Sequence, residues 1–324
     1  MFFKVSRACI AVVLIALFSV FPGAASASSA GGTLLHYPDF ASRSITAREV
    51  TVWLPDGYDP QGSPLPVLYM QDGENLYEPS RSLSHADWGV DVTLMRLIRE
   101  GKVPPVIVVG IASSKQRGRD YLPQKVYERL PEDMKTTIQN SWGGPPVSDD
   151  YLQFMVTELK PFIDKNFHTK PDRDNTFVMG SSMGGLISFY AQTEYPEVFG
   201  ASASLSIHLP LMDPRHSADD ANRYAVKIIE AFSSYLDASG ASPGSNRFYI
   251  DQGTEALDSY YRPYNQGLEA VLRSKGWTAA GQFKSEIFPG ENHSENAWAK
   301  RLGVPLMFLL SPGNCCDPSK NNGP

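Results

Sequence analysis

The sequence predicts an α/β fold in which a mostly parallel central sheet is covered by helices on both faces. Short apolar runs suited to buried strands alternate with amphipathic stretches suited to helices, which is the pattern of a parallel sheet. The clearest strand is the unbroken, β-branched run at 106–111. Another strand, at 175–179, enters the glycine-rich turn at 180–185, and a helix follows at once.

The remaining elements are predicted in order along the chain. We expect strands at 49–54, 66–70, 201–207, 247–250 and 283–288, and helices at 87–98, 149–162, 186–195, 224–236, 261–275 and 294–310. Asp87 is expected to cap the first of these helices, and Asp149 or Asp150 the second. Two polar stretches, at about 113–148 and 209–222, interrupt the alternation, and we expect irregular insertions on the substrate side.

The first 27 residues are predicted to be a cleavable signal peptide. Lys4 and Arg7 precede an apolar run at 9–21, which is short for a membrane span. The small residues at 25–27 then form an A-x-A site, so we expect cleavage before Ser28. An uncleaved N-terminal anchor is the alternative. The expected product is periplasmic or secreted: a single catalytic domain at 28–324, with a loose leader at 28–35 and a loose tail from about 311.

Charge and cysteine content narrow the possible partners. The signal segment holds two of the 29 basic residues and none of the 35 acidic ones, so the mature chain has 27 basic against 35 acidic residues, a net charge of −8. Without a basic run, a nucleic-acid partner is not expected. Cys315 and Cys316 alone remain after cleavage. They could form a vicinal disulfide, pair between molecules or stay reduced, and their spacing matches no metal site.

The turn at 180–185 has the pattern G-x-S-x-G, with Ser182 at its centre. A serine on a tight strand-to-helix turn adopts a strained backbone conformation, and its neighbours two residues away must lack bulk. The N–H groups of the following helix then face any anion that forms there. This context predicts a nucleophilic serine, and a glycine-rich structural turn is the alternative.

A serine nucleophile needs a base, and three histidines follow Ser182. His293 lies directly after the last predicted strand, where the base is expected, although a helix-capping or surface role is possible. His208 comes too early for an acid to lie between it and the serine, so it is a candidate substrate contact or a surface residue. His216 lies in the polar insertion and is expected to be solvated.

Three carboxylates compete to orient His293. Glu255 is favoured, because it lies beyond Gly253 on a loop that can fold toward the histidine. Asp251 is second, and could instead end its strand or form a turn. Asp258 is third, because an acid near the start of a helix is often only a cap.

Two backbone N–H groups are expected to hold the oxyanion. The first is that of Met183, which follows the nucleophile, and the second is that of Glu74, in the loop after the strand at 66–70. Asp72, in the same loop, is a possible substrate contact. Arg117 and Arg119, in the first insertion, could also contact substrate or could belong to a solvated loop.

Several stretches together resemble the "Putative esterase" family of the α/β-hydrolase superfamily, which includes esterase D, feruloyl and acetyl-xylan esterases, trilactone siderophore esterases and mycolyltransferases. The resemblance lies in 52–55, 66–73, 105–111, 180–186, 195–200 and 290–294. It implies an α/β-hydrolase fold with Ser182 as nucleophile and His293 as base, and an Asp or Glu near the position of Glu255. Some siderophore esterases use only the Ser–His pair, so the resemblance leaves the acid open. It also implies that the loop at 72–74 contributes to the oxyanion site.

These inferences predict an exported serine carboxyl-ester hydrolase that forms an acyl-enzyme and needs no metal or organic cofactor. The substrate is expected to be a small-molecule or polysaccharide-linked ester, with no stable membrane insertion after cleavage. An acyltransferase would use the same residues, and a binding module on an inactive scaffold is a further alternative. A siderophore lactone would favour Arg117 and Arg119 at the site, whereas a plant-polysaccharide ester would favour Tyr121 and Trp142.

Overall fold

The computed structural model describes residues 25–28, 31–82, 84–215, 218–244, 246–279 and 281–311, with the backbone alone at 25–28 and 218–221. Most of the predicted signal peptide, His216 and both tail cysteines therefore lie outside the described residues. The expected cleavage site at 25–27 falls in an edge strand, β1 (Ala25–Ser28), which pairs with β2 (Thr33–Phe40). No helix among the described residues is both long and apolar enough to cross a membrane.

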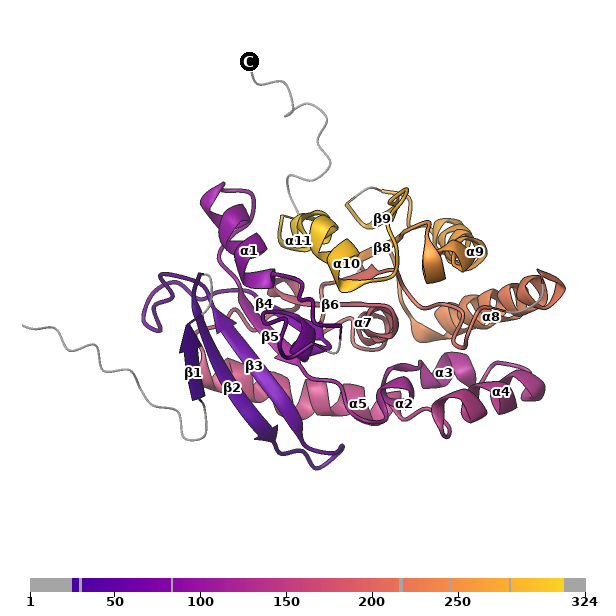
Figure 1. The fold of residues 1–324 in the computed structure, drawn as a ribbon, viewed down its shortest axis with the longest axis horizontal. Helices are drawn as coiled ribbons and strands as arrows, with labels where there is room; N and C mark the ends of the chain where they lie inside the picture. The colour runs from indigo at the N-terminus through magenta and orange to yellow at the C-terminus, as the bar shows by residue number, and fades with distance from the viewer. Residues whose placement is uncertain are drawn as a thin grey trace, which may run out of the picture.

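Over the described residues, the strands form one nine-stranded sheet in the order β1-β2-β3-β5-β4-β6-β7-β8-β9 (Figure 1). The further strands are β3 (Arg48–Leu54), β4 (Val67–Gln71), β5 (Ile107–Ile111), β6 (Thr176–Ser181), β7 (Ala201–Leu205), β8 (Phe248–Gln252) and β9 (Phe283–Ile287). Three neighbouring pairs are antiparallel: β1–β2, β2–β3 and β3–β5. The other five pairs are parallel: β5–β4, β4–β6, β6–β7, β7–β8 and β8–β9. The predicted α/β class with a mostly parallel sheet is confirmed.

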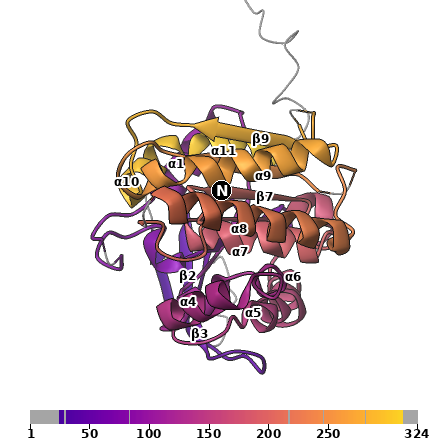
Figure 2. The ribbon, with the colours of Figure 1, turned by 90° about the vertical axis from the view of Figure 1, so that its right-hand side faces the viewer.

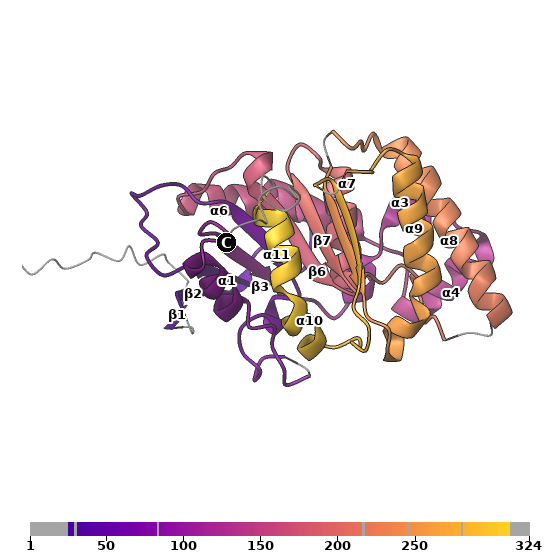
Figure 3. The same ribbon diagram turned by 90° about the horizontal axis from the view of Figure 1, so that it is seen from above.

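The helices lie on both faces of this sheet (Figures 1 and 3). One face carries α1 (Val90–Arg99), α10 (Glu295–Arg301) and α11 (Gly303–Leu310). The helices of the other face are α2 (Arg117–Tyr121), α3 (Gln124–Tyr127), α4 (Glu132–Trp142), α5 (Ser148–Phe154), α6 (Lys160–Asn166), α7 (Met183–Glu194), α8 (Ala218–Ser239) and α9 (Arg262–Ser274). Figure 2 shows α8 and α9 running side by side, and α9 also contacts β8.

Alternation along the central strands divides the core into two layers. Leu68 and Met70 of β4 pack on the side of α1 and α11, whereas Val67 and Tyr69 pack on the side of α7. Successive side chains of a strand point to opposite faces, and here both faces are covered. This is why β4 is buried along its whole length.

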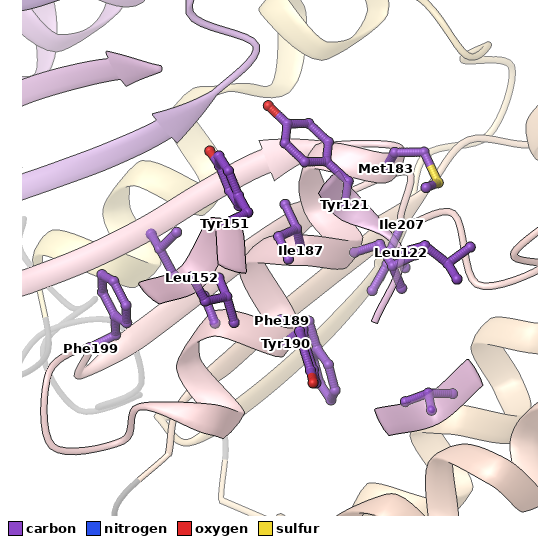
Figure 4. Close-up of a cluster of buried hydrophobic side chains, with 14 of the residues drawn as sticks. Tyr121, Leu122, Tyr151, Leu152, Met183, Ile187, Phe189, Tyr190, Phe199 and Ile207 are labelled. Carbon is purple, nitrogen blue, oxygen red and sulfur yellow. The ribbon is translucent and has the colours of Figure 1, made fainter. Parts of the chain in front are cut away.

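The insertion at 113–148 is mostly helical, so the expectation of a long irregular loop was wrong. Helix α2 packs on α5 and α7, α3 packs on α8, and α4 adds Met134 and Ile138 to the same core. Figure 4 shows Tyr121 and Leu122 in one buried cluster with Tyr151 and Met183. Short helices with one polar face contain few apolar residues, so their sequence shows only a weak helical pattern. The insertion therefore supports the glycine-rich turn directly.

Three local expectations are corrected. The leader expected to be loose at 28–35 enters β2, which pairs with β3. Helix α1 begins after Gly89, whose N–H donates to the Asp87 carboxylate, so Asp87 does not cap it. Helix α5 begins at Ser148, which places both Asp149 and Asp150 inside its first turn. A π-helical turn (Met155–Leu159) then joins α5 to α6.

Candidate active site

Ser182 lies on the sharp turn between β6 and α7, with φ 55° and ψ −124°. Its N–H donates to the Leu205 carbonyl at 2.8 Å, and its carbonyl accepts from the His208 N–H at 3.1 Å. A positive φ is costly for a residue with a side chain and persists only where the surroundings impose it. The end of β7 therefore holds the serine in its strained conformation.

Two glycines make this turn possible. A Cβ on Gly180 would lie 2.5 Å from the Gly184 carbonyl, and a Cβ on Gly184 would lie 2.8 Å from an Asp72 carboxylate oxygen. Real side chains do not tolerate contacts of this length. The spacing in G-x-S-x-G thus follows from the packing of the turn against itself and against the loop after β4.

His293 follows β9 and is hydrogen-bonded through Nδ1 to Asp258 Oδ1 at 2.6 Å. The histidine side chain is 13% exposed and the aspartate is fully buried. Tyr261 and Trp298 lie edge-on to the imidazole, with ring centroids 5.5 and 5.0 Å away. An ionised carboxylate can only accept, so Nδ1 carries the proton and Nε2 is left as the basic nitrogen.

The Asp258 carboxylate is held as an anion by several donors. Its Oδ2 accepts hydrogen bonds from the Ser206 hydroxyl and the Gly253 N–H, both at 2.6 Å. Burial opposes the charge, but the hydrogen bond and charge of His293, with these two donors, lower the pKa of Asp258 below its usual value. Asp258 is thus suited to hold a protonated imidazole.

The preference for Glu255 as the partner of His293 was therefore wrong. A short 3-10 helix (Ala256–Tyr260) turns Asp258 inward, while Glu255 stays outside its first turn, exposed and close to the Thr254 hydroxyl. Asp251 is used elsewhere, because it forms a buried ion pair with Arg301 at 3.0 Å.

The expected oxyanion donors lie at the starts of two helical turns. Met183 is the first residue of α7, and an N–H at this position has no acceptor within its own helix. Glu74 lies in a 3-10 turn (Gly73–Asn75) that directly follows β4, and its carboxylate is bonded to the N–H and the hydroxyl of Ser113. The assignment of the Glu74 N–H as second donor stays a prediction.

Arg117 and Asp72 form a two-pronged ion pair beside the turn. Arg117 Nε lies 2.6 Å from Asp72 Oδ1, and Nη2 lies 2.8 Å from Oδ2. Burial lowers the pKa of the Arg117 guanidinium, but the charge of Asp72 outweighs it and raises this pKa above its usual value. Arg119 instead donates to the Pro145 carbonyl at 2.8 Å and to the Gln116 side chain at 3.0 Å. Arg117 thus joins the insertion to the loop after β4, whereas both of these contacts of Arg119 stay within the insertion.

His208 and Tyr261 form a buried pair next to the serine. His208 Nδ1 lies 2.5 Å from the Tyr261 hydroxyl, and the His208 backbone N–H donates to the Ser182 carbonyl. Burial, together with the nearby His293 and Arg117, lowers the pKa of His208 to about 3, so its imidazole is neutral at physiological pH. Trp142 of the first insertion lies edge-on to His208, and its Nε1 donates to the Leu211 carbonyl. The sequence reasoning had included His208 but missed Tyr261.

The site therefore combines a strained serine, a histidine whose Nδ1 is fixed by a hydrogen bond, and the buried carboxylate that accepts that bond. Within the residues that the structure describes, no group of His, Cys, Asp and Glu side chains is arranged to hold a metal ion.

Comparisons with known proteins agree with this fold. A ferulic acid esterase structure superposes with a TM-score of 0.59 at 19% identity, covering 86% of this chain and 98% of that one. An enterobactin esterase from Shigella flexneri superposes with a TM-score of 0.60 at 20% identity, covering 88% of this chain and 61% of the other. The fold is thus that of α/β-hydrolase-like esterases.

The chain belongs to the "Putative esterase" family, whose profile matches residues 43–308. The uncharacterized protein YbbA of Bacillus subtilis is 26% identical over 268 residues, which cover 81% of this chain and 92% of that protein. The endo-1,4-beta-xylanase/feruloyl esterase of Xylanibacter ruminicola is 31% identical over 165 residues, which cover 48% of this chain but only 19% of that larger protein.

Proposed function

We propose that this chain is an exported serine carboxyl-ester hydrolase in which Ser182, His293 and Asp258 act together. The observation that carries the proposal is the pairing of His293 with a buried Asp258, on the same sheet edge as a serine held at positive φ. Membership of an esterase family supports the reaction class.

In this mechanism, Ser182 Oγ attacks the ester carbonyl while His293 Nε2 removes the hydroxyl proton. The oxygen of the tetrahedral intermediate becomes negative, and the N–H groups of Met183 and Glu74 stabilise it. His293 then returns the proton to the departing alcohol. Water, deprotonated by His293, attacks the acyl-enzyme, and the carboxylic acid leaves as the serine recovers its proton. Asp258 orients the imidazole and stabilises its protonated form throughout.

A screen of esters that differ in their acid portion identifies the substrate. Ferulic acid esterases and enterobactin esterases among the structural neighbours suggest feruloyl esters and siderophore lactones. Arg117 and Arg119 do not favour the anionic siderophore, because Asp72 neutralises one and the Pro145 carbonyl holds the other. Tyr121 is fully buried, so it does not offer a stacking surface for a polysaccharide ester. The screen should therefore include feruloyl, acetyl-xylan and siderophore esters together with acyl thioesters.

Export rests on the charged, apolar and small-residue segments of the first 27 residues. Intact-mass measurement on protein recovered from outside the cytoplasm tests it. We expect a chain beginning at Ser28, and a recovered chain beginning at Met1 would contradict cleavage.

The hydrolase proposal is tested by Ser182→Ala, with Ser181→Ala as the matched control. Both serines lie on the turn, but only Ser182 has the positive φ of the nucleophile position. On a short-chain p-nitrophenyl ester, we expect Ser182→Ala to lose activity by on the order of 10³-fold or more, because only binding and oxyanion stabilisation remain. Ser181→Ala should retain most of it. Equal activity of Ser182→Ala and the unmodified enzyme would refute the mechanism.

A further inference from the structure

Ser206 directly follows β7 and lies behind the Asp258 carboxylate, away from His293. It is fully buried and has φ 42°, a backbone conformation that a serine adopts only where its surroundings impose it. Its hydroxyl oxygen has three polar neighbours: Asp258 Oδ2 at 2.6 Å, Arg301 Nη2 at 2.7 Å and Trp298 Nε1 at 3.0 Å. Ser206 therefore joins α10 to the proposed acid.

The donor and acceptor capacities of these groups determine where the hydroxyl proton lies. A guanidinium nitrogen and an indole nitrogen can only donate, so Arg301 and Trp298 occupy the two lone pairs of Ser206 Oγ. The single hydroxyl proton of Ser206 is therefore donated to Asp258, the one acceptor among these three neighbours. Hydroxyl groups with two fixed donors lose the freedom to rotate, and hydrogen bonds in such a chain polarise one another.

We propose that Ser206 is a positioning residue for the reaction, and that Arg301 and Trp298 lock its hydroxyl as a permanent donor to Asp258. The proposal rests on the proposed serine-hydrolase function. Together with the Gly253 N–H, Ser206 occupies Oδ2 of Asp258 and leaves Oδ1 for His293. The carboxylate cannot rotate without losing two short hydrogen bonds, so the imidazole keeps its tautomer and its orientation.

Asp251 completes the arrangement by neutralising Arg301. Its carboxylate accepts from Arg301 Nη2 at 3.0 Å and from the Ser206 backbone N–H at 2.8 Å. Both side chains of this ion pair are almost fully buried, at 2% and 0% exposure. An unpaired guanidinium here would be costly. Asp251, which the sequence also offered as the acid, thus contributes by holding the residues behind Asp258.

The test compares Ser206→Ala with Ser202→Ala in the full chain. Ser202 is equally buried, lies in β7 four residues before Ser206, and its hydroxyl has no partner within the described part of the protein. We expect Ser206→Ala to lower kcat on the order of 10- to 100-fold with KM little changed, as expected for a misoriented catalytic group. Ser202→Ala should leave kcat unchanged. Thermal unfolding of each variant shows whether it is folded.

A proton NMR readout separates positioning from general destabilisation. The Nδ1 proton of His293, in its short bond to Asp258, is expected to resonate far downfield, and Ser206→Ala should shift or broaden that signal. Trp298→Phe keeps a ring beside His293 but removes one donor to Ser206, so its loss of kcat should be smaller. Because Trp298 acts through Ser206, the double variant should be no slower than Ser206→Ala alone.

The outcomes distinguish this inference from the proposed function itself. A folded Ser206→Ala enzyme with unchanged kcat and an unchanged His293 signal, beside an inactive Ser182→Ala, would overturn the role of Ser206 and leave the hydrolase intact. An active Ser182→Ala would instead overturn the proposed function. Additive losses in the double variant would overturn the claim that Trp298 acts through Ser206.

Discussion

Asp258 receives the Nδ1 hydrogen bond of His293 at 2.6 Å, while Glu255, three residues earlier, points to the Thr254 hydroxyl at the surface. The two acids differ in burial as well as in partner, since Asp258 is fully buried and Glu255 is exposed.

Asp258→Asn should lower kcat by on the order of 10³- to 10⁴-fold, because an amide in place of the carboxylate favours the wrong imidazole tautomer. Glu255→Gln is the matched control and should change kcat by less than about twofold, as a surface substitution away from the site. Steady-state kinetics on one ester substrate checks both. A severe loss in Glu255→Gln with an active Asp258→Asn would restore Glu255 as the acid.

Gly180→Ala should damage both folding and activity. The new Cβ would lie 2.5 Å from the Gly184 backbone, so the turn must shift, at a cost of about 1–3 kcal/mol in the free energy of unfolding. Gly281→Ala is the control, because a Cβ there meets no atom within 4 Å. Urea unfolding and esterase assays should single out Gly180→Ala. Equal stability of the two variants would contradict the close packing of the turn.

The Asp72–Arg117 pair should be strongly coupled. A double-mutant cycle with Asp72→Asn and Arg117→Gln should give a coupling energy of about 1–3 kcal/mol, since the pair is bidentate and the carboxylate is only 5% exposed. The exposed pair Arg99–Asp56 should give less than about 1 kcal/mol in the same experiment. Similar coupling in both cycles would show that Arg117 does not fix the loop after β4.

The neutral His208 should make stability depend on pH. Its folded-state pKa of about 3 lies below its ordinary value of 6.5, so the unfolded chain binds a proton more readily. The stability it contributes is full above pH 6.5 and is lost as the pH falls toward 3. By linkage, the loss should reach about 2–3 kcal/mol near pH 4.5.

This loss is measured by urea unfolding at several pH values between 7 and 4.5. Asp258 contributes a loss of the same sign, but only below its own ordinary pKa of 3.8. His208→Phe should therefore flatten the curve in the higher range. Parallel curves for His208→Phe and the unmodified protein would show that another group titrates there.

The strands and the serine turn were predictable from the sequence because they depend on local patterns. The run 106–111 is apolar throughout, and Gly180 is required by its close approach to Gly184 within the same turn. His293 followed from its position after the last strand.

The acid was not predictable, because a 3-10 turn at 256–260 decides which carboxylate faces inward. The inward position of Asp258 is held by the nearby Gly253 N–H and by the hydroxyl of Ser206, which lies 52 residues away in the chain. Tyr261 and the helices of 113–148 were missed for the same reason. Their side chains are buried by tertiary packing that no local pattern records.

The central claim, that Ser182 is the nucleophile, is tested most directly by covalent labelling. A fluorophosphonate reacts with an activated serine by displacing fluoride, and peptide mass spectrometry then locates the adduct. We predict one adduct per chain, on Ser182, that is absent from Ser182→Ala and strongly slowed in Asp258→Asn. An adduct on another residue, or an active enzyme that takes no label, would contradict the account.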